Sequence, residues 1–205
     1  MQDLRLRVTA RRLAVGLGLA LVIAATAYVS TLRLGGTAIG PGAAEVSLAA
    51  TGRTTVGPRI GQLAPEFLSA GSQKPLLADL DGKAVRLTDF AGKPLWIVFW
   101  ATWCTPCQEE ASDIRAAYHA HEGHLAVLAI DVQEPAEAAR AFAIKNDLDY
   151  TIGLDPTAAI KTLYGGWAMP SHFFVGADGV IRDRYIGQMT AELMEQHLQE
   201  ILGPT

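Results

Sequence analysis

Residues 95–107 read LWIVFWATWCTPC and decide the fold. The first seven are apolar and rich in residues that favour strands, which predicts a central strand buried on both faces. Pro106 suits the first turn of a helix, where its missing N–H would have had no partner, and Ile114 and Ala117 continue an apolar stripe. The stretch therefore predicts a strand that runs directly into a helix, with two cysteines at the junction.

Cys104 and Cys107 are the two cysteines of the chain. Unpaired N–H groups in a first helical turn, together with the positive end of the helix dipole, favour a thiolate there. In a C-x-x-C motif this setting lowers the pKa of a thiol from about 8.5 to about 7 or below. We therefore expect Cys104 to be the attacking sulfur of a redox disulfide. Cys107, about one helical turn further on, would resolve a mixed disulfide at Cys104.

The cysteine pair has three other conceivable uses. A purely structural disulfide remains an alternative, although so short a loop constrains little chain entropy. Haem attachment would need a histidine where the chain has Gln108. Zinc would need some of the histidines at 119, 121 and 124, but on one continuous helix His119 lies about 18 Å beyond Cys107. Because zinc ligands lie within about 2.3 Å of the metal, we expect no metal site here.

Two β-hairpins are predicted, each around an Asp-Gly pair that tolerates the positive φ of a tight turn. The first joins residues 76–80 to 84–87 and the second joins 172–175 to 180–186. Residues 125–132 (LAVLAIDV) predict another buried strand. Helices are predicted over 135–148, over 156–163 with Asp155 as N-cap, and over 190–202.

Residues 13–32 form an uncharged, mostly apolar run. As a helix, a run of this length crosses the roughly 30 Å of bilayer hydrocarbon. Segment 1–12 carries four arginines against the single acid Asp3, so the positive-inside rule predicts a signal anchor with this basic segment in the cytoplasm. Everything after the span should lie outside the cytoplasm. A cleaved signal peptide is the alternative, because Ala25-Thr26-Ala27 matches a cleavage site.

Residues 33–60 are rich in glycine and small residues without apolar periodicity, which predicts a flexible linker. Residues 61–205 suit one folded domain. This part has ten Lys and Arg against nineteen Asp and Glu, a formal charge of minus nine. An acidic surface without a basic stripe argues against a nucleic-acid partner.

The chain resembles the thioredoxin-like disulfide reductases of the TlpA and ResA kind. The resemblance rests on GQLAPEF at 61–67, FWATWCTPC at 99–107, and AMPSHFFV at 168–175 followed by ADG. It implies an α/β, thioredoxin-like three-layer fold with a central mixed sheet and an extra N-terminal β-hairpin, preceded by one transmembrane helix. It also implies a thiol-disulfide oxidoreductase that acts as a disulfide reductase.

The resemblance also assigns further site residues. It implies that Met169-Pro170 is a cis peptide against the cysteine pair, which would let the backbone of Met169 pair with an extended substrate segment. In the family an acidic residue three positions after the second cysteine assists proton transfer, and this residue is Glu110. The alternative for Glu110 is a favourable charge in a first helical turn. Val98 replaces the buried aspartate of thioredoxins proper, so an internal base must come from elsewhere.

Trp103 flanks the site and is expected either to contact substrate or to belong to the core. The resemblance implies that the chain exchanges dithiols for disulfides with client proteins such as apocytochromes c. No cofactor is expected. A membrane electron donor would supply the dithiol, and the sequence leaves the direction of electron flow open.

Two other functions use cysteines in a related fold or site. A peroxiredoxin-like peroxidase would need Thr or Ser three residues before a cysteine, and neither cysteine has one. A copper-binding or metallochaperone module remains an alternative, with both thiolates and His172 as ligands.

Overall fold

The computed structural model describes residues 57–69 and 71–203. These residues form seven strands, four α-helices and one 3-10 helix. In chain order they are β1 (Leu77–Asp79), β2 (Ala84–Val85), the 3-10 helix η2 (Leu87–Phe90), β3 (Leu95–Trp100), α2 (Thr105–Ala120), β4 (Ala126–Val132), α3 (Ala136–Lys145), β5 (Thr151–Asp155), α4 (Ala159–Leu163), β6 (Ser171–Val175), β7 (Ile181–Ile186) and α5 (Ala191–Leu202).

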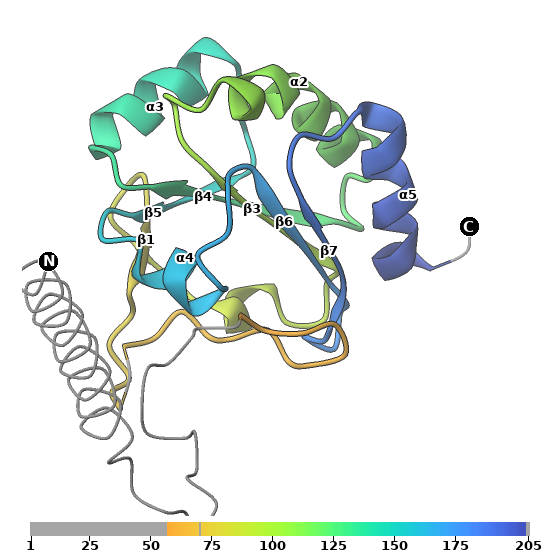
Figure 1. Cartoon of the computed structure of the whole chain (residues 1–205), viewed down its shortest axis with the longest axis horizontal. Helices are drawn as coiled ribbons and strands as arrows, with labels where there is room; N and C mark the ends of the chain where they lie inside the picture. The colour runs from red at the N-terminus through yellow and green to blue at the C-terminus, as the bar shows by residue number, and fades with distance from the viewer. Residues whose placement is uncertain (1–56, 70, 204–205) are drawn as a thin grey trace, which may run out of the picture. The chain divides into compact units, whose positions relative to one another are not determined.

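The strands form one mixed sheet in the order β2-β1-β5-β4-β3-β6-β7. Strand β3 lies inside the sheet, parallel to β4 and antiparallel to β6. All six residues of β3 are buried, as its unbroken apolar sequence predicts. Figure 1 shows β3 crossing the middle of the sheet, with α2 above it.

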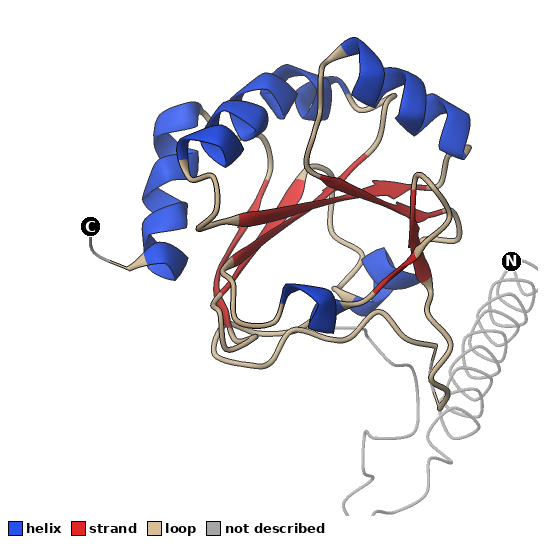
Figure 2. Ribbon diagram, turned by 180° about the vertical axis from the view of Figure 1, so that it is seen from behind, coloured by secondary structure: helices blue, strands red, loops and turns tan. Residues whose placement is uncertain are grey.

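Helices cover both faces of the sheet. Figure 2 shows the three longer helices on one face, and η2 with α4 on the other. Side chains of β3 alternate between the two layers, as the period of a strand requires. Trp96 and Trp100 pack with α2, α3 and α5, whereas Ile97 and Phe99 pack with the residues around α4. The thioredoxin-like α/β fold with a mixed sheet is therefore confirmed.

The predicted hairpins and the strand-helix junction are confirmed, since β1 pairs with β2 and β6 with β7 in antiparallel register. Strand β5 was not predicted, because its sequence TIGLD is short and has no clear alternation. It extends the sheet between β4 and β1. The three predicted helices form, but α3 ends at Lys145 and not at 148.

The start of α4 corrects the prediction of a helix from residue 156. Asp155 is the last residue of β5, and the helix begins only at Ala159. The N-cap is Ala158, so the prediction of Asp155 at that position is wrong. The Oδ2 of Asp155 still accepts a hydrogen bond from the backbone N–H of Lys161 in the first turn, at 2.8 Å.

The predicted segments 1–12 and 13–32 and almost all of the linker 33–60 lie outside the described residues. Within residues 57–69 and 71–203, no helix is both long and apolar enough to cross a bilayer.

Candidate active site

The two cysteines lie where β3 passes into α2, and they form a disulfide with Cα atoms 5.2 Å apart. Cys104 is the N-cap of α2, with extended backbone geometry, and Cys107 lies in the first turn. Cys104 is 7% exposed and Cys107 is 2% exposed. An incoming sulfur therefore reaches Cys104 more easily, which agrees with the predicted division of roles.

The start of α2 creates a favourable place for a sulfur anion. Pro106 occupies the first turn, as the sequence predicts. The first intrahelical bond runs from the N–H of Gln108 to the carbonyl of Cys104 at 3.0 Å. The preceding N–H groups have no partner within the helix, and the helix dipole adds positive potential at this end. Both effects favour the thiolate of Cys104 after the disulfide is reduced.

Met169 and Pro170 are joined by a cis peptide bond, as the resemblance implies. Met169 packs against the same cluster of buried residues that contains Cys104 and Cys107. Pro170 is buried immediately before β6, and its carbonyl accepts a hydrogen bond from the N–H of Gly187 at 2.9 Å. The peptide is thus fixed beside the cysteine pair.

Glu110 is buried in α2, with only 1% of its surface exposed. Its Oε2 accepts a hydrogen bond from the backbone N–H of Met189 at 3.1 Å, while Oε1 has no hydrogen-bond partner. Burial raises the pKa of this carboxyl to about 8, because a charge is poorly solvated there. A glutamate that served only as a favourable charge near the helix start would be exposed to solvent. Glu110 is buried, so this alternative role loses support.

His172 is a neighbour of Glu110, and its Nε2 lies 3.4 Å from Oε1 of that carboxyl. The indole N–H of Trp96 donates to Nδ1 of His172 at 3.3 Å, and Nε2 lies 3.2 Å from the carbonyl of Gly187. The ring therefore carries its proton on Nε2. Burial lowers the pKa of His172 to about 3, so the imidazole is neutral.

These contacts bear on the copper alternative. The one lone pair of the neutral ring is on Nδ1, which already accepts from Trp96. His172 would have to break this buried hydrogen bond to bind a metal. Among residues 57–69 and 71–203, no group of three or more His, Cys, Asp or Glu is arranged to hold a metal ion.

Trp103 precedes Cys104 and is 62% exposed, so its alternative reading as a core residue is wrong. Trp100, in contrast, is buried and packs against Phe142 of α3.

The histidines near the end of α2 lie apart from the cysteines. His119 is in the last turn of α2 and contacts Asp149 at 3.1 Å, as expected if they do not form a zinc site with the first turn.

Three residues near the cysteines were not identified from the sequence. They are Thr102, which lies two residues before Cys104, Glu134, whose carboxylate accepts two hydrogen bonds from Thr102, and Asp131, a buried acid beside Glu134. Asp131 could have been found, because a carboxylate inside the apolar strand LAVLAIDV requires a partner. Glu134 carries no local signal, since a glutamate beside a helix start is common on protein surfaces.

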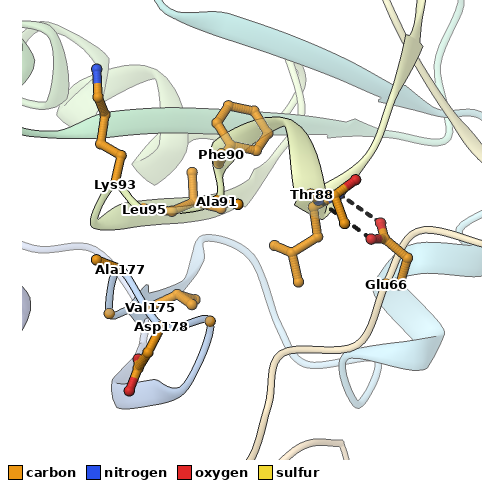
Figure 3. A pocket seen from close by; sticks show the side chains of 12 residues that line it. Glu66, Thr88, Phe90, Ala91, Lys93, Leu95, Val175, Ala177 and Asp178 are labelled. Atoms are coloured by element: carbon orange, nitrogen blue, oxygen red, sulfur yellow. Dashed lines mark hydrogen bonds between the residues drawn. The ribbon is translucent and has the colours of Figure 1, made fainter.

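A hollow lies at the end of β3 opposite to the cysteines. It is lined by η2, Leu95 and the turn that follows Val175, and β6 runs from the cysteine end toward it. Figure 3 shows Glu66 at its edge, next to Thr88. The carboxylate of Glu66 accepts hydrogen bonds from the backbone N–H groups of Leu87 and Thr88. These bonds hold η2 in place, and the hollow is not part of the cysteine site.

Comparison with known proteins agrees with this geometry. The model of the AhpC/TSA family matches residues 60–184. The thiol-disulfide oxidoreductase ResA of Bacillus cereus is 31% identical over 144 residues, covering 70% of this chain and 79% of the relative. The thioredoxin-like protein YneN of Bacillus subtilis is 34% identical over 146 residues, covering 70% and 81% respectively.

A solved structure shares both the fold and part of the sequence. A protein from Chlorobium tepidum, assigned as the thiol:disulfide interchange protein DsbE, superposes with a TM-score of 0.60 at 27% identity. The match covers 71% of this chain and 99% of that one. With a redox disulfide at the start of α2 and relatives of this kind, the chain belongs to the AhpC/TSA family and is a thiol-disulfide oxidoreductase.

Proposed function

We propose that this oxidoreductase is anchored by residues 13–32, works outside the cytoplasm, and reduces the disulfides of client proteins. The observation that carries the proposal is the Cys104–Cys107 disulfide at the start of α2, with the buried carboxyl of Glu110 one turn further along the same helix. A reductase needs an attacking thiolate, a resolving thiol and a proton acceptor, and these three residues supply them.

In the first step, the thiolate of Cys104 attacks one sulfur of a client disulfide. A new S–S bond joins Cys104 to the client as the client's own S–S bond breaks, and the departing sulfur takes up a proton from solvent. Cys104 is suited to this role because it is the more exposed sulfur and caps the positive end of α2.

In the second step, Cys107 gives its proton to the carboxylate of Glu110 and attacks the sulfur of Cys104. The bond to the client breaks, its second sulfur leaves and is protonated, and Cys104 and Cys107 form the disulfide. Two electrons have then passed from the protein's dithiol to the client. Because burial raises the pKa of Glu110 to about 8, its carboxylate is a base of nearly the strength of a thiolate.

Client binding would use Met169 and Trp103. Among the described residues, the N–H and carbonyl of Met169 make no backbone hydrogen bond outside the strand ladders. An extended client segment can pair with these groups by strand addition, and main-chain pairing accepts varied sequences. The exposed ring of Trp103 offers apolar area beside the reacting sulfur.

Apocytochromes c are the proposed clients, because haem attachment requires the cysteines of a C-x-x-C-H motif to be reduced. Outside the cytoplasm such motifs become oxidised, so a local reductase is needed. A membrane-bound dithiol donor would return two electrons to the Cys104–Cys107 disulfide after each cycle.

The Cys107→Ser variant tests the client proposal, because it can form the mixed disulfide but cannot resolve it. We expect apocytochromes c to be captured through Cys104 when the full-length variant is produced in its native host and analysed by non-reducing electrophoresis and mass spectrometry. The matched control is Cys104→Ser/Cys107→Ser, which should capture nothing. If proteins that lack haem-binding motifs were captured with the same enrichment as apocytochromes c, the choice of client would be refuted.

A separate experiment tests the location. Alkaline phosphatase fused after Thr205 should be active, since it requires an oxidising compartment. The fusion should stay with the membrane fraction after a salt wash. An inactive fusion would contradict the proposed side of the membrane. A soluble product that begins just after Ala27 would show that the alternative, a cleaved signal peptide, is correct.

A further inference from the structure

A four-residue turn carries the chain from β3 to the reacting sulfur. The N–H of Cys104 donates to the carbonyl of Ala101 at 3.2 Å, which closes the turn. Thr102 and Trp103 are its two corner residues, and Trp103 is exposed. Whatever fixes the corner at Thr102 therefore fixes where the sulfur of Cys104 lies.

All the polar groups of Thr102 are engaged. Its backbone N–H donates to Oε1 of Glu134, and its hydroxyl donates to Oε2 of the same carboxylate, each at 2.5 Å. Its carbonyl accepts a hydrogen bond from the side-chain amide of Gln108 in α2. Glu134 lies between β4 and α3, so the turn is held by an element remote in sequence as well as by the active-site helix.

Asp131 is a buried acid next to Glu134. It lies in β4, opposite Trp100 of β3, and its carboxyl neighbours that of Glu134. Two carboxyl groups in such contact share a proton, because two adjacent buried charges repel each other. Burial and the contact with Glu134 raise the pKa of Asp131 to about 9. Burial acts against ionisation of Glu134 too, but hydrogen bonds from Asp131 and Thr102 outweigh it and lower that pKa.

We propose that Glu134 is a positioning residue for thiol-disulfide exchange, which holds the Ala101–Cys104 turn through Thr102. The ionised carboxylate accepts from both donors of Thr102, and charge-assisted hydrogen bonds of this kind are strong. Exchange requires the attacking sulfur to be aligned with the disulfide, and small displacements slow such reactions steeply. The inference concerns the exchange itself and does not depend on the client or on the direction of electron flow.

Thr102→Val and Thr102→Ser form the first test. Valine has the shape of threonine without the hydroxyl, whereas serine keeps the hydroxyl. Reduced protein is mixed with 5,5′-dithiobis(2-nitrobenzoate): Cys104 attacks this disulfide and releases one nitrothiobenzoate, and Cys107 then expels the second. We expect Thr102→Val to slow the first release about tenfold, the effect of losing one hydrogen bond to a charged group. Thr102→Ser should restore the rate to within about twofold of the unmodified chain.

Glu134→Gln forms the second test, because it removes the charge but keeps the shape. We expect about a tenfold slower first release. The double variant Thr102→Val/Glu134→Gln should be no slower than the slower single variant, since both changes remove the same bond. Glu137→Gln is the matched control, because Glu137 is exposed in the first turn of α3, and its rate should not change.

Circular dichroism and thermal melting check that each variant is folded before its rate is compared. Folded Glu134→Gln with an unchanged rate would overturn the proposal, and so would equal losses in Thr102→Val and Thr102→Ser. Fully multiplicative effects in the double variant would also overturn it. If Glu134→Gln does not fold, the Thr102 pair decides the outcome alone.

Discussion

The indole N–H of Trp96 donates a hydrogen bond to Nδ1 of His172 inside the core, 3.3 Å away. The two residues belong to adjacent strands, β3 and β6, and their rings lie with centroids 5.9 Å apart. This bond sets the tautomer of His172 and so directs its Nε2–H toward the carbonyl of Gly187, with Oε1 of Glu110 close by at 3.4 Å from Nε2. A contact between two strands thus orders the surroundings of the proposed proton acceptor.

Trp96→Phe removes the donor and leaves Nδ1 of His172 buried without a partner. We expect the free energy of unfolding to fall by about 2 to 4 kcal/mol, from the unpaired nitrogen and the lost ring volume together. Urea unfolding of the oxidised protein measures this change. Trp103→Phe is the control, because Trp103 is largely exposed and should cost less than about 0.5 kcal/mol. Equal effects of the two substitutions would contradict the prediction.

Glu110→Gln should slow the resolving step, in which Cys107 displaces the client. Because the pKa of Glu110 is about 8, the carboxylate becomes more abundant as pH rises toward 8, and the rate should rise with it. The variant should be slower by about tenfold to a hundredfold and lack this dependence. A pH–rate profile of mixed-disulfide release provides the measurement. Glu109→Gln, an exposed neighbour, is the control, and a profile shared by both variants would exclude Glu110 as the base.

Stability should fall as the pH rises above about 6.5. The folded-state pKa values of Glu110 and Asp131, about 8 and about 9, lie above the unfolded values of 4.5 and 3.8. Their stabilising contribution is therefore complete below the unfolded values and is lost as pH rises through the folded ones. His172 behaves oppositely: its contribution is complete above 6.5 and is lost as pH falls toward about 3.

Glu110→Gln separates these contributions. In the oxidised protein the cysteines do not titrate, so urea unfolding at pH 6.5 and pH 9 reports on the other groups. We expect the variant to lose less stability than the unmodified chain between these two values, because it lacks the Glu110 ionisation. An identical loss in both proteins would show that Glu110 ionises freely in the folded state.

Much of this site could be predicted from the sequence because its determinants are local. The strand, the helix start and the cysteines occupy the single stretch 95–107, and an Asp-Gly pair marks each hairpin. The environment of Glu110 could not be predicted from periodicity, because it depends on Met189 and His172, which lie far along the chain.

The contact of Thr102 with Glu134 could not be predicted from the sequence for a related reason. The two residues are 32 positions apart, and they meet only because β3 and β4 pair in parallel and end at the same edge of the sheet. Strand β5 was missed because its five residues carry little pattern of their own. It is defined by its pairing with β4 and β1, which is a property of the completed sheet.

Cys104→Ser should abolish disulfide reduction, whereas Cys107→Ser should still react once with a small disulfide. A hydroxyl is not a nucleophile toward disulfides at neutral pH, so the loss at residue 104 leaves no accessible attacking group. Release of nitrothiobenzoate from 5,5′-dithiobis(2-nitrobenzoate) counts the reactions per molecule. Rapid reaction of Cys104→Ser, at a rate equal to that of Cys107→Ser, would reverse the assigned roles.

Trp103→Ala should separate client binding from the chemistry. The ring is 62% exposed and adjacent to Cys104, so its removal leaves the fold and the reacting sulfur in place while it deletes apolar area that a client could cover. We expect KM for a client peptide disulfide to rise about fivefold to tenfold, as for loss of a modest interface contact. The rate with 5,5′-dithiobis(2-nitrobenzoate) should change less than about twofold, since so small a disulfide gains little from the ring. Ile144→Ala serves as the control, because Ile144 is also a largely exposed apolar residue, at 72%, and lies on α3 and not in the turn that carries Cys104. A matching rise in KM in both variants would mean that exposed apolar area in general, and not Trp103, determines client affinity.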